Sequence, residues 1–254
     1  MPLTLDKVAA KAPLLLKKAE TAAAAIDLSG LNGQTAKVAL VLDFSGSMRE
    51  RYASGAMQNL AEQVLAMATQ FDDDGAIDFF VFDTHAAYLG EISLEDFKGG
   101  VNRLTSGRHM GRTNYAEAFL AVRDHFGFNP AKPAPERRGF FGRKKVEAAP
   151  EAGPASEPVY ALFLTDGNPD NRTEATNALI EVSKAPIFWK FLSVGEEHKD
   201  YLQKLDDMPG RFVDNADYKP VGEVDRLTDA GLFEAMLDEF PEWVAEVRSK
   251  GLIK

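Results

Sequence analysis

The stretch DFSGSM, at residues 43–48, places side-chain oxygens at every second position directly after an apolar run. Asp43, Ser45 and Ser47 supply one carboxylate and two hydroxyls, and the preceding KVALVL has the composition of a buried β-strand. Oxygen-only donor sets suit hard cations such as Mg²⁺ or Mn²⁺. The alternative is a turn followed by a capped helix, since serine, aspartate and glycine are ordinary turn and N-cap residues.

Two further loops carry oxygen-bearing side chains to the same place if the chain folds around a parallel sheet. The apolar segment 159–165 runs into the turn TDG, so Asp166 follows the end of a second strand. Thr113 lies just ahead of a helix predicted at 114–126. Ligand sites in open α/β sheets lie beyond the carboxyl ends of the parallel strands. We therefore expect all three loops to meet at one edge of the sheet.

The elements that would position these residues alternate between apolar, β-rich segments and segments of helical period. This alternation predicts an α/β fold: a Rossmann-like, doubly wound, mostly parallel sheet with one antiparallel edge strand and helices on both faces. Strands are expected at 37–42, 77–82, 159–165 and 186–194, with the antiparallel edge strand at 86–92. Helices are expected along the apolar stripe from Met57 to Phe71 and at 114–126, 171–184 (with Asp170 as N-cap), 199–206 and 230–250.

The chain is expected to contain an N-terminal helical arm at residues 1–36 and one domain at 37–254. The arm is rich in alanine, its Pro13 suits a helix start, and it should pack on the outside of the domain. Residues 128–158 are rich in proline and alanine and lack any period, which predicts a flexible insertion on the edge opposite Asp43. Within it, RRGFFGRKK at 137–145 is either a docking segment for an acidic partner or lipid surface, or a solvated tether.

Composition excludes several classes of function. With 254 residues, 45% hydrophobic content and a formal net charge of -10, the chain is an ordinary acidic globular protein, for which nucleic acid is not the expected partner. The absence of cysteine excludes disulfides and thiolate-bound metals. No apolar run reaches the length of a membrane span, and Leu14–Leu16 is too short for a secretory signal. We therefore expect a cytoplasmic protein.

Together these residues resemble the von Willebrand factor A (VWA) family and its metal-ion-dependent adhesion site (MIDAS). That family's motif is D-x-S-x-S, then a distant threonine, then an aspartate in a T-D-G turn. Here these positions are Asp43, Ser45, Ser47, Thr113 and Asp166, in the same order. The resemblance implies that the three hydroxyls contact Mg²⁺ or Mn²⁺ and that the two carboxylates hold the ion directly or through water. It also implies an open coordination position that a carboxylate of a partner protein fills.

A closer resemblance lies in FDDDG, HMGRTNY, PIFWKF and EFPEW, together with the N-terminal arm. These segments are similar to bacterial VWA proteins associated with tellurium-resistance gene clusters and, more distantly, to the copine A domain; the insertion departs from that pattern. The resemblance implies a protein-interaction module, without enzymatic activity, in the response to tellurite, metals or general stress. Two alternatives stay open: an adaptor that presents substrates to an AAA+ ATPase, and a Mg²⁺-dependent hydrolase with His85 or His109 as general base.

Overall fold

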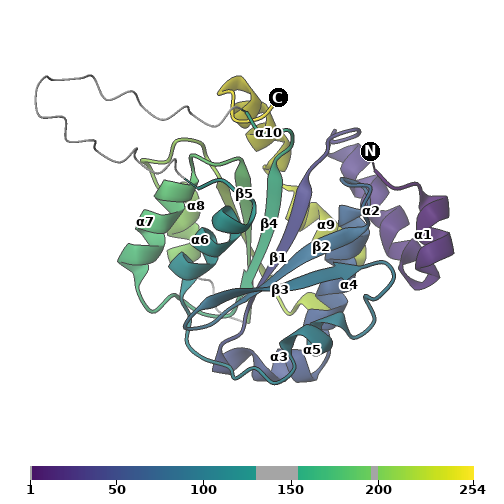
Figure 1. Ribbon diagram of the computed structural model, residues 1–254, viewed down its shortest axis with the longest axis horizontal. Coiled ribbons are helices and arrows are strands. Elements are labelled where there is room, and N and C mark those ends of the chain that lie inside the picture. The colour runs from purple at the N-terminus through teal and green to yellow at the C-terminus, as the bar shows by residue number, and fades with distance from the viewer. Residues whose placement is uncertain (1, 130–153, 196–199) are drawn as a thin grey trace, which may run out of the picture.

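The computed structural model describes residues 2–129, 154–195 and 200–254, and within them the strands form one six-stranded sheet (Figure 1). The strand order is β3-β2-β1-β4-β5-β6. Strand β3 runs antiparallel to β2, and every other neighbouring pair is parallel. The strands are β1 Lys37–Asp43, β2 Ala76–Phe82, β3 Ala86–Ser93, β4 Val159–Thr165, β5 Ile187–Val194 and β6 Ala216–Gly222. The predicted fold class, with its antiparallel edge strand, is confirmed.

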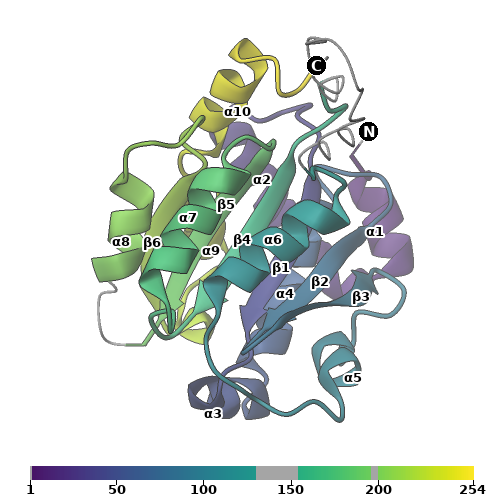
Figure 2. The same cartoon turned by 60° about the vertical axis from the view of Figure 1, so that its left-hand side comes forward.

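Helices cover both faces of the sheet, which explains why the central strands are apolar on both sides. One face carries α6 Tyr115–His125, α7 Arg172–Val182 and α8 Asp200–Asp207 (Figure 2). The other carries α4 Ala56–Ala68, α9 Asp229–Leu237 and α10 Phe240–Ser249. The shorter helices are α3 Arg49–Ala53, α5 Gly100–Thr105 and the 3₁₀ helices η2 Gly46–Met48 and η3 Val224–Arg226. Among the helices of the described residues, none combines the length and hydropathy that a membrane span requires.

The single helix expected at 230–250 is wrong, because two helices occupy this region. Helix α9 ends at Leu237 and α10 begins at Phe240. Between them Glu239 adopts a left-handed conformation with φ of 61°. Pro241, in the first turn of α10, has no N–H for a hydrogen bond and would break a continuous helix at that point. The apolar period continues through the break, so periodicity alone does not reveal it.

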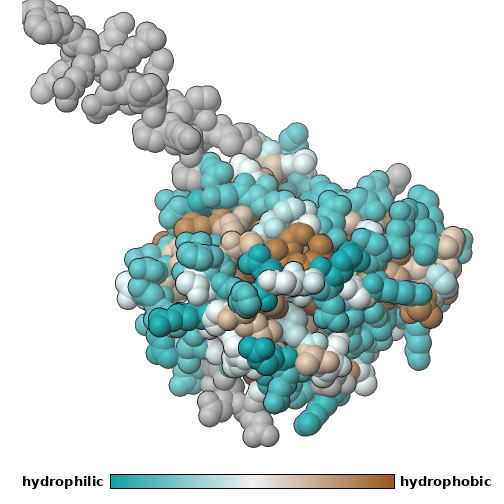
Figure 3. All heavy atoms as spheres, turned by 60° about the horizontal axis from the view of Figure 1, so that its bottom comes forward, coloured by the Kyte–Doolittle hydropathy of each residue, from teal (hydrophilic) through white to brown (hydrophobic). Residues whose placement is uncertain are grey.

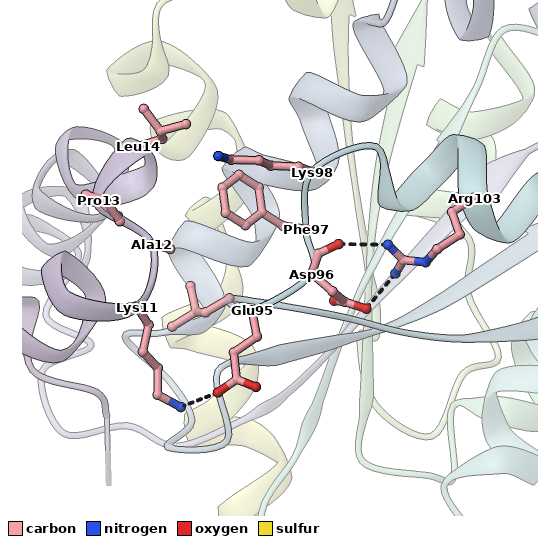
Figure 4. Close-up of a pocket in the computed structure, with 10 residues that line it drawn as sticks. Lys11, Ala12, Pro13, Leu14, Glu95, Asp96, Phe97, Lys98 and Arg103 are labelled. Atoms are coloured by element: carbon pink, nitrogen blue, oxygen red, sulfur yellow. Dashed lines mark hydrogen bonds and ion pairs between the residues drawn. The ribbon is translucent and has the colours of Figure 1, made fainter.

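The N-terminal segment contains α1 Leu5–Lys11, the 3₁₀ helix η1 Pro13–Leu15 and α2 Leu16–Leu28. Pro13 lies at the start of η1, as predicted. Helix α2 packs against α4 and α9, and Leu15 and Ala19 are fully buried there. On the other side, Lys11 Nζ lies 3.1 Å from Glu95 Oε1 across the small pocket between this segment and the loop before α5 (Figure 4). The segment therefore contacts the rest of the chain through buried apolar side chains and through ion pairs, which include Lys11 with Glu95 and Lys18 with Glu62.

The insertion predicted at 128–158 lies mostly outside the described residues, and RRGFFGRKK lies wholly outside them. Its flanks are described: α6 ends at His125 and β4 begins at Val159. Ala155 pairs with Ile253 in a parallel bridge, in which Ala155 N donates to Leu252 O at 2.9 Å. Because β4 runs from Val159 toward Thr165, this junction lies at the end of the sheet away from Asp43.

Candidate metal centre

The predicted site lies at the point where the strand order reverses. From β1 the chain passes to β2 on one side of the sheet, whereas β4 leads to β5 on the other side. Asp43 is the last residue of β1, and Asp166 directly follows β4. Loops leave such a switch point in opposite directions and open a crevice at the carboxyl ends of the strands. In Figure 1 this end of the sheet points down, toward α3.

Hydrogen bonds connect four of the five predicted site residues in one cluster. Ser45 N donates to Asp43 Oδ1 at 2.8 Å, and the Ser45 and Ser47 hydroxyl oxygens are 3.1 Å apart. Ser47 Oγ donates to Asp166 Oδ1 at 2.8 Å. Asp43 is fully buried, Asp166 is partly buried and Ser47 is exposed. The cluster therefore runs from a buried carboxylate to a rim that solvent can reach. Figure 3 shows this end of the molecule, where hydrophilic side chains surround small hydrophobic areas.

The third predicted loop, which carries Thr113, lies beside the motif. Ser45 and Gly111 form a parallel bridge, in which Gly46 N donates to Gly111 O at 3.3 Å. A Cβ at Gly111 would lie 2.9 Å from Thr84 Oγ1, so the close approach of this loop requires glycine. Thr113 N donates to Asp170 Oδ2 at 3.3 Å. The backbone thus places Thr113 at the site edge, and the contact of its hydroxyl with a metal remains a prediction.

The expected role of Asp170 as N-cap of α7 is wrong. Asn171 caps the helix, and its Oδ1 accepts hydrogen bonds from Thr173 N and Glu174 N, both at 3.1 Å. Asp170 instead bonds to the Thr113 backbone through both its carboxylate and its own N–H. Because aspartate and asparagine both cap helices well, the sequence alone does not separate two adjacent candidates.

The electrostatics of the cluster favour a cation. Burial raises the pKa of Asp43 to about 6, against the hydrogen bonds from Thr165 and Ser45 that favour the ionised carboxylate. The negative charge of Asp166 raises the pKa of Asp43 further. Thr165 Oγ1 donates to Asp43 Oδ2 at 2.6 Å. A positive charge beside these carboxylates would offset both the desolvation of Asp43 and the repulsion between the two acids.

The donor set fits a hard divalent ion. The clustered side chains offer carboxylate and hydroxyl oxygens, and one of the two carboxylates is fully buried. Mg²⁺ and Mn²⁺ prefer such oxygen ligands, and one or two carboxylates with several waters complete a Mg²⁺ shell. Asp43, Ser45, Ser47 and Asp166 would hold the ion, with Thr113 as the candidate from the third loop.

Sequence reasoning missed two residues at the site, Arg51 and Glu223. Arg51 Nη1 lies 3.1 Å from Asp166 Oδ2. Its Nε and Nη2 donate to Glu223 Oε2 and Oε1, at 3.1 and 2.7 Å. Arg51 follows the motif closely on α3, but its partner is 172 positions away and follows β6, a strand that the sequence analysis did not predict. Neither a motif nor a period could have indicated this contact.

A second acidic cluster lies near the edge strand β6, where oxygens of Asp206, Asp217 and Glu239 come within 4.8 Å of one another. The fully buried Lys190 ammonium contacts Asp217. Burial raises the pKa of Asp206 to about 6. The Lys190 ammonium already supplies a positive charge to this cluster, so we assign the candidate metal centre to the carboxyl ends of β1 and β4.

Comparison with known proteins decides the family. The family model vWA-TerF-like, described as the vWA found in the TerF C terminus, matches residues 35–135 and 143–253. The chain belongs to this VWA family. This membership confirms the VWA resemblance and is consistent with a link to tellurium resistance. VWA-like domains are mainly protein-interaction modules.

Individual relatives agree with this assignment. The uncharacterized protein YcbR of Bacillus subtilis (strain 168) is 36% identical over 222 residues, which cover 87% of this VWA protein and 82% of YcbR. The SpRpn10 VWA domain has a similar fold, with a TM-score of 0.52 and 8% identity over 78% of this chain and 93% of that one. Proximal thread matrix protein 1 from the mussel byssus has a TM-score of 0.51 and 11% identity over 81% of this chain. The VWA protein spans about half of that chain, 48% of its length.

Proposed function

We propose that this VWA protein is a divalent-metal-dependent protein-interaction module. Its MIDAS, formed by Asp43, Ser45, Ser47, Thr113 and Asp166, holds Mg²⁺ or Mn²⁺ and binds an acidic residue of a partner protein. The observation that carries the proposal is the hydrogen-bonded cluster of carboxylates and hydroxyls at the β1–β4 switch point.

Each residue has a distinct part in this proposal. Asp43 and Asp166 supply the negative charge that attracts the ion, and the hydroxyls of Ser45, Ser47 and Thr113 supply neutral oxygens. The bound ion supplies positive charge to which a partner's carboxylate can coordinate. Ser47 is exposed and Asp166 is partly buried, so the partner can approach from the rim while Asp43 stays beneath it. The role is binding without catalysis, in the cytoplasm, in a bacterial response to tellurite, metals or general stress.

Thermal unfolding tests the metal site. A cation that binds only the folded state stabilises it by mass action, by about 2.7 kcal/mol at a hundred times its Kd. We expect Mg²⁺ or Mn²⁺ to raise the melting temperature, EDTA to reverse the rise, and Asp43→Ala to abolish it. Asp6→Ala, which removes the same charge from an exposed position in α1, should respond like the parent. If neither the parent nor Arg51→Gln, which lacks the positive charge beside Asp166, responds to either metal at millimolar concentration, the proposed metal site is wrong.

Metal-dependent capture tests the partner. The parent, incubated with lysate in Mg²⁺, should retain a protein that EDTA releases and that Asp43→Ala does not bind. Replacing acidic residues of that protein one at a time by their amides should then identify a single position on which binding depends, because one carboxylate completes the metal shell. Metal binding without any such partner contradicts the interaction role.

A further inference from the structure

The guanidinium of Arg51 lies between two carboxylates at the candidate metal centre. It contacts Asp166 through Nη1 and holds Glu223 with two parallel N–H···O bonds through Nε and Nη2. The side chains are 19% exposed for Arg51, 10% for Asp166 and 32% for Glu223. Bidentate arginine–carboxylate pairs are strong and directional, and this pair is partly shielded from water.

The guanidinium lies beside the backbone of the loops that follow β5 and β6. Arg51 projects from α3, directly after the DFSGSM motif, and Glu223 follows β6. Gly195 follows β5 with φ of +96°, and a Cβ there would lie 3.6 Å from Arg51 Nη2. Gly195 N donates to Gly222 O at 3.0 Å, which joins the two loops. Arg51 thus spans the loops after β4, β5 and β6.

Both carboxylate oxygens of Asp166 already accept a hydrogen bond in this arrangement. Its Oδ1 accepts from Ser47 and its Oδ2 accepts from Arg51. The hydrogen bonds to Glu223, more than any other influence, raise the pKa of Arg51, so the guanidinium carries its full charge at any ordinary pH. A divalent ion that used Asp166 would meet this positive charge a few ångströms away, where like charges repel.

We propose that Arg51 is the resident counter-ion of Asp166 and opposes metal binding at the site, while Glu223 anchors Arg51 and shares its positive charge with Asp166. Arg51 then determines the metal concentration at which the site loads. This inference rests on the proposed metal site. A merely structural Arg51, which only ties α3 to the loop after β6, would affect stability without affecting metal affinity.

Calorimetric titration with Mn²⁺ tests the inference in four variants. Arg51→Met and Arg51→Gln remove the charge, and each should bind Mn²⁺ about tenfold more tightly than the parent because the repulsion is gone. Arg51→Lys loses the two parallel bonds to Glu223 but keeps the positive charge, so its affinity should stay within about threefold of the parent. Arg49→Met removes an exposed charge from the same helix and should leave the affinity nearly unchanged.

The melting temperature without metal is a second measurement, and in it the same variants should be less stable than the parent. In EDTA, Arg51→Met and Arg51→Gln should melt at a lower temperature than the parent, since Asp166 loses its counter-ion. Glu223→Gln should weaken Mn²⁺ binding several-fold, because Arg51 then pairs with Asp166 alone.

The outcomes separate this inference from the proposed function. If Arg51→Gln, which can still donate hydrogen bonds to Glu223, binds Mn²⁺ no more tightly than Arg49→Met, the counter-ion role is wrong. Equal tightening by Arg51→Lys and Arg51→Gln also overturns it, because the charge would then be irrelevant. Should the parent and every variant ignore Mn²⁺, the metal site itself fails. The glutamine variant keeps the test valid if the methionine variant does not fold.

Discussion

At the residue scale, Asp43 is the most constrained member of the site. Its two carboxylate oxygens accept hydrogen bonds from Ser45 N and Thr165 Oγ1. The hydroxyl of the buried Tyr52 donates to its backbone oxygen at 3.0 Å. The carboxylate is fully buried, so the hydrogen bonds that stabilise its charge are worth more than they would be in water. Thr165 is therefore a positioning residue that, together with Ser45, stabilises the ionised form of Asp43.

Replacing Thr165 by valine keeps the shape of the side chain but removes the donor to Asp43. We expect Thr165→Val to lower the free energy of unfolding at pH 7.5 by about 1–3 kcal/mol, since a buried carboxylate loses a hydrogen bond. It should also weaken Mn²⁺ binding, because the bond that orients the Asp43 carboxylate is gone. Thr165→Ser retains the hydroxyl and should restore the metal affinity, even though it loses a methyl group. Denaturant unfolding and Mn²⁺ titration measure the two effects. Equal metal affinity in the valine and serine variants would argue against this role.

The site was predictable to the extent that it is local. Asp43, Ser45 and Ser47 form a short motif, and Asp166 directly follows an apolar strand, so residue type and strand order suffice to bring them together. Arg51 and Glu223 meet only because β6 lies beside β5. The sequence near Arg51 and near Glu223 therefore contains no pattern that indicates their contact, because the contact depends on where β6 lies in the sheet.

At the element scale, the strands with two covered faces were recognised from their apolar runs and the edge strand β3 was also predicted, whereas the other edge strand, β6, was not. Strands β4 and β5 are buried along their whole lengths and contain long apolar runs. Strand β6, with the sequence ADYKPVG, contains charged residues and Pro220. An edge strand tolerates a proline because one side of its backbone needs no partner strand. Because of these features the sequence of β6 does not look like that of a strand. Glu223, which follows β6, and the acidic cluster of Asp206, Asp217 and Glu239 were missed for the same reason.

The N-terminal arm provides a second test at this scale. The assignment of residues 1–36 as an arm and 37–254 as the domain is a proposal, and we further propose that both unfold together. Leu15 is fully buried where the arm contacts the domain, whereas the neighbouring Leu14 is 68% exposed. We expect Leu15→Ala to lower the free energy of unfolding by about 2–5 kcal/mol and Leu14→Ala to change it by less than about 0.5 kcal/mol.

Urea unfolding, followed by tryptophan fluorescence, measures this difference. Trp189 and Trp243 both lie in the core of the domain and not in the arm, so their signal reports domain unfolding. If Leu15→Ala leaves the fluorescence midpoint where it is in the parent, the arm unfolds independently and the proposed coupling is wrong.

At the scale of the whole molecule, the two ends of the sheet carry different features. The candidate metal centre lies at the carboxyl ends of β1 and β4. The junction with the insertion lies at the other end, where Ala155 pairs with the C-terminal segment. The expected strand directions agree with the structure and place Asp43 and the described junction at opposite ends, because strand direction follows from the order of strands and helices. Sequence reasoning does not predict the pairing of Ala155, which depends on where the last helix ends.

Replacing residues 130–153 with a Gly/Ser segment of the same length tests the separation of the two ends. We expect the melting temperature to change by no more than about 2 °C and the Mn²⁺ affinity to stay within about twofold, because the proline- and alanine-rich composition of these residues predicts little apolar packing and a replacement of equal length keeps the closure entropy the same. Ala155→Pro is the contrasting variant, since it removes the N–H that donates to Leu252 O, and it should destabilise the fold. Loss of the folded state in the replacement variant would show that the segment packs against the domain.

The position of the candidate metal centre also has a consequence for folding. Residues 37–42 of β1 pair with residues 159–164 of β4, so more than a hundred residues separate the two halves of the site along the chain. Such long-range pairings form late and slowly, because the intervening chain must first be brought together. Until β1 and β4 are side by side, Asp43 and Asp166 belong to separate parts of an open chain. An ion that binds the proposed site would therefore slow the unfolding of the finished domain, but it would have no complete site with which to guide the early steps of folding.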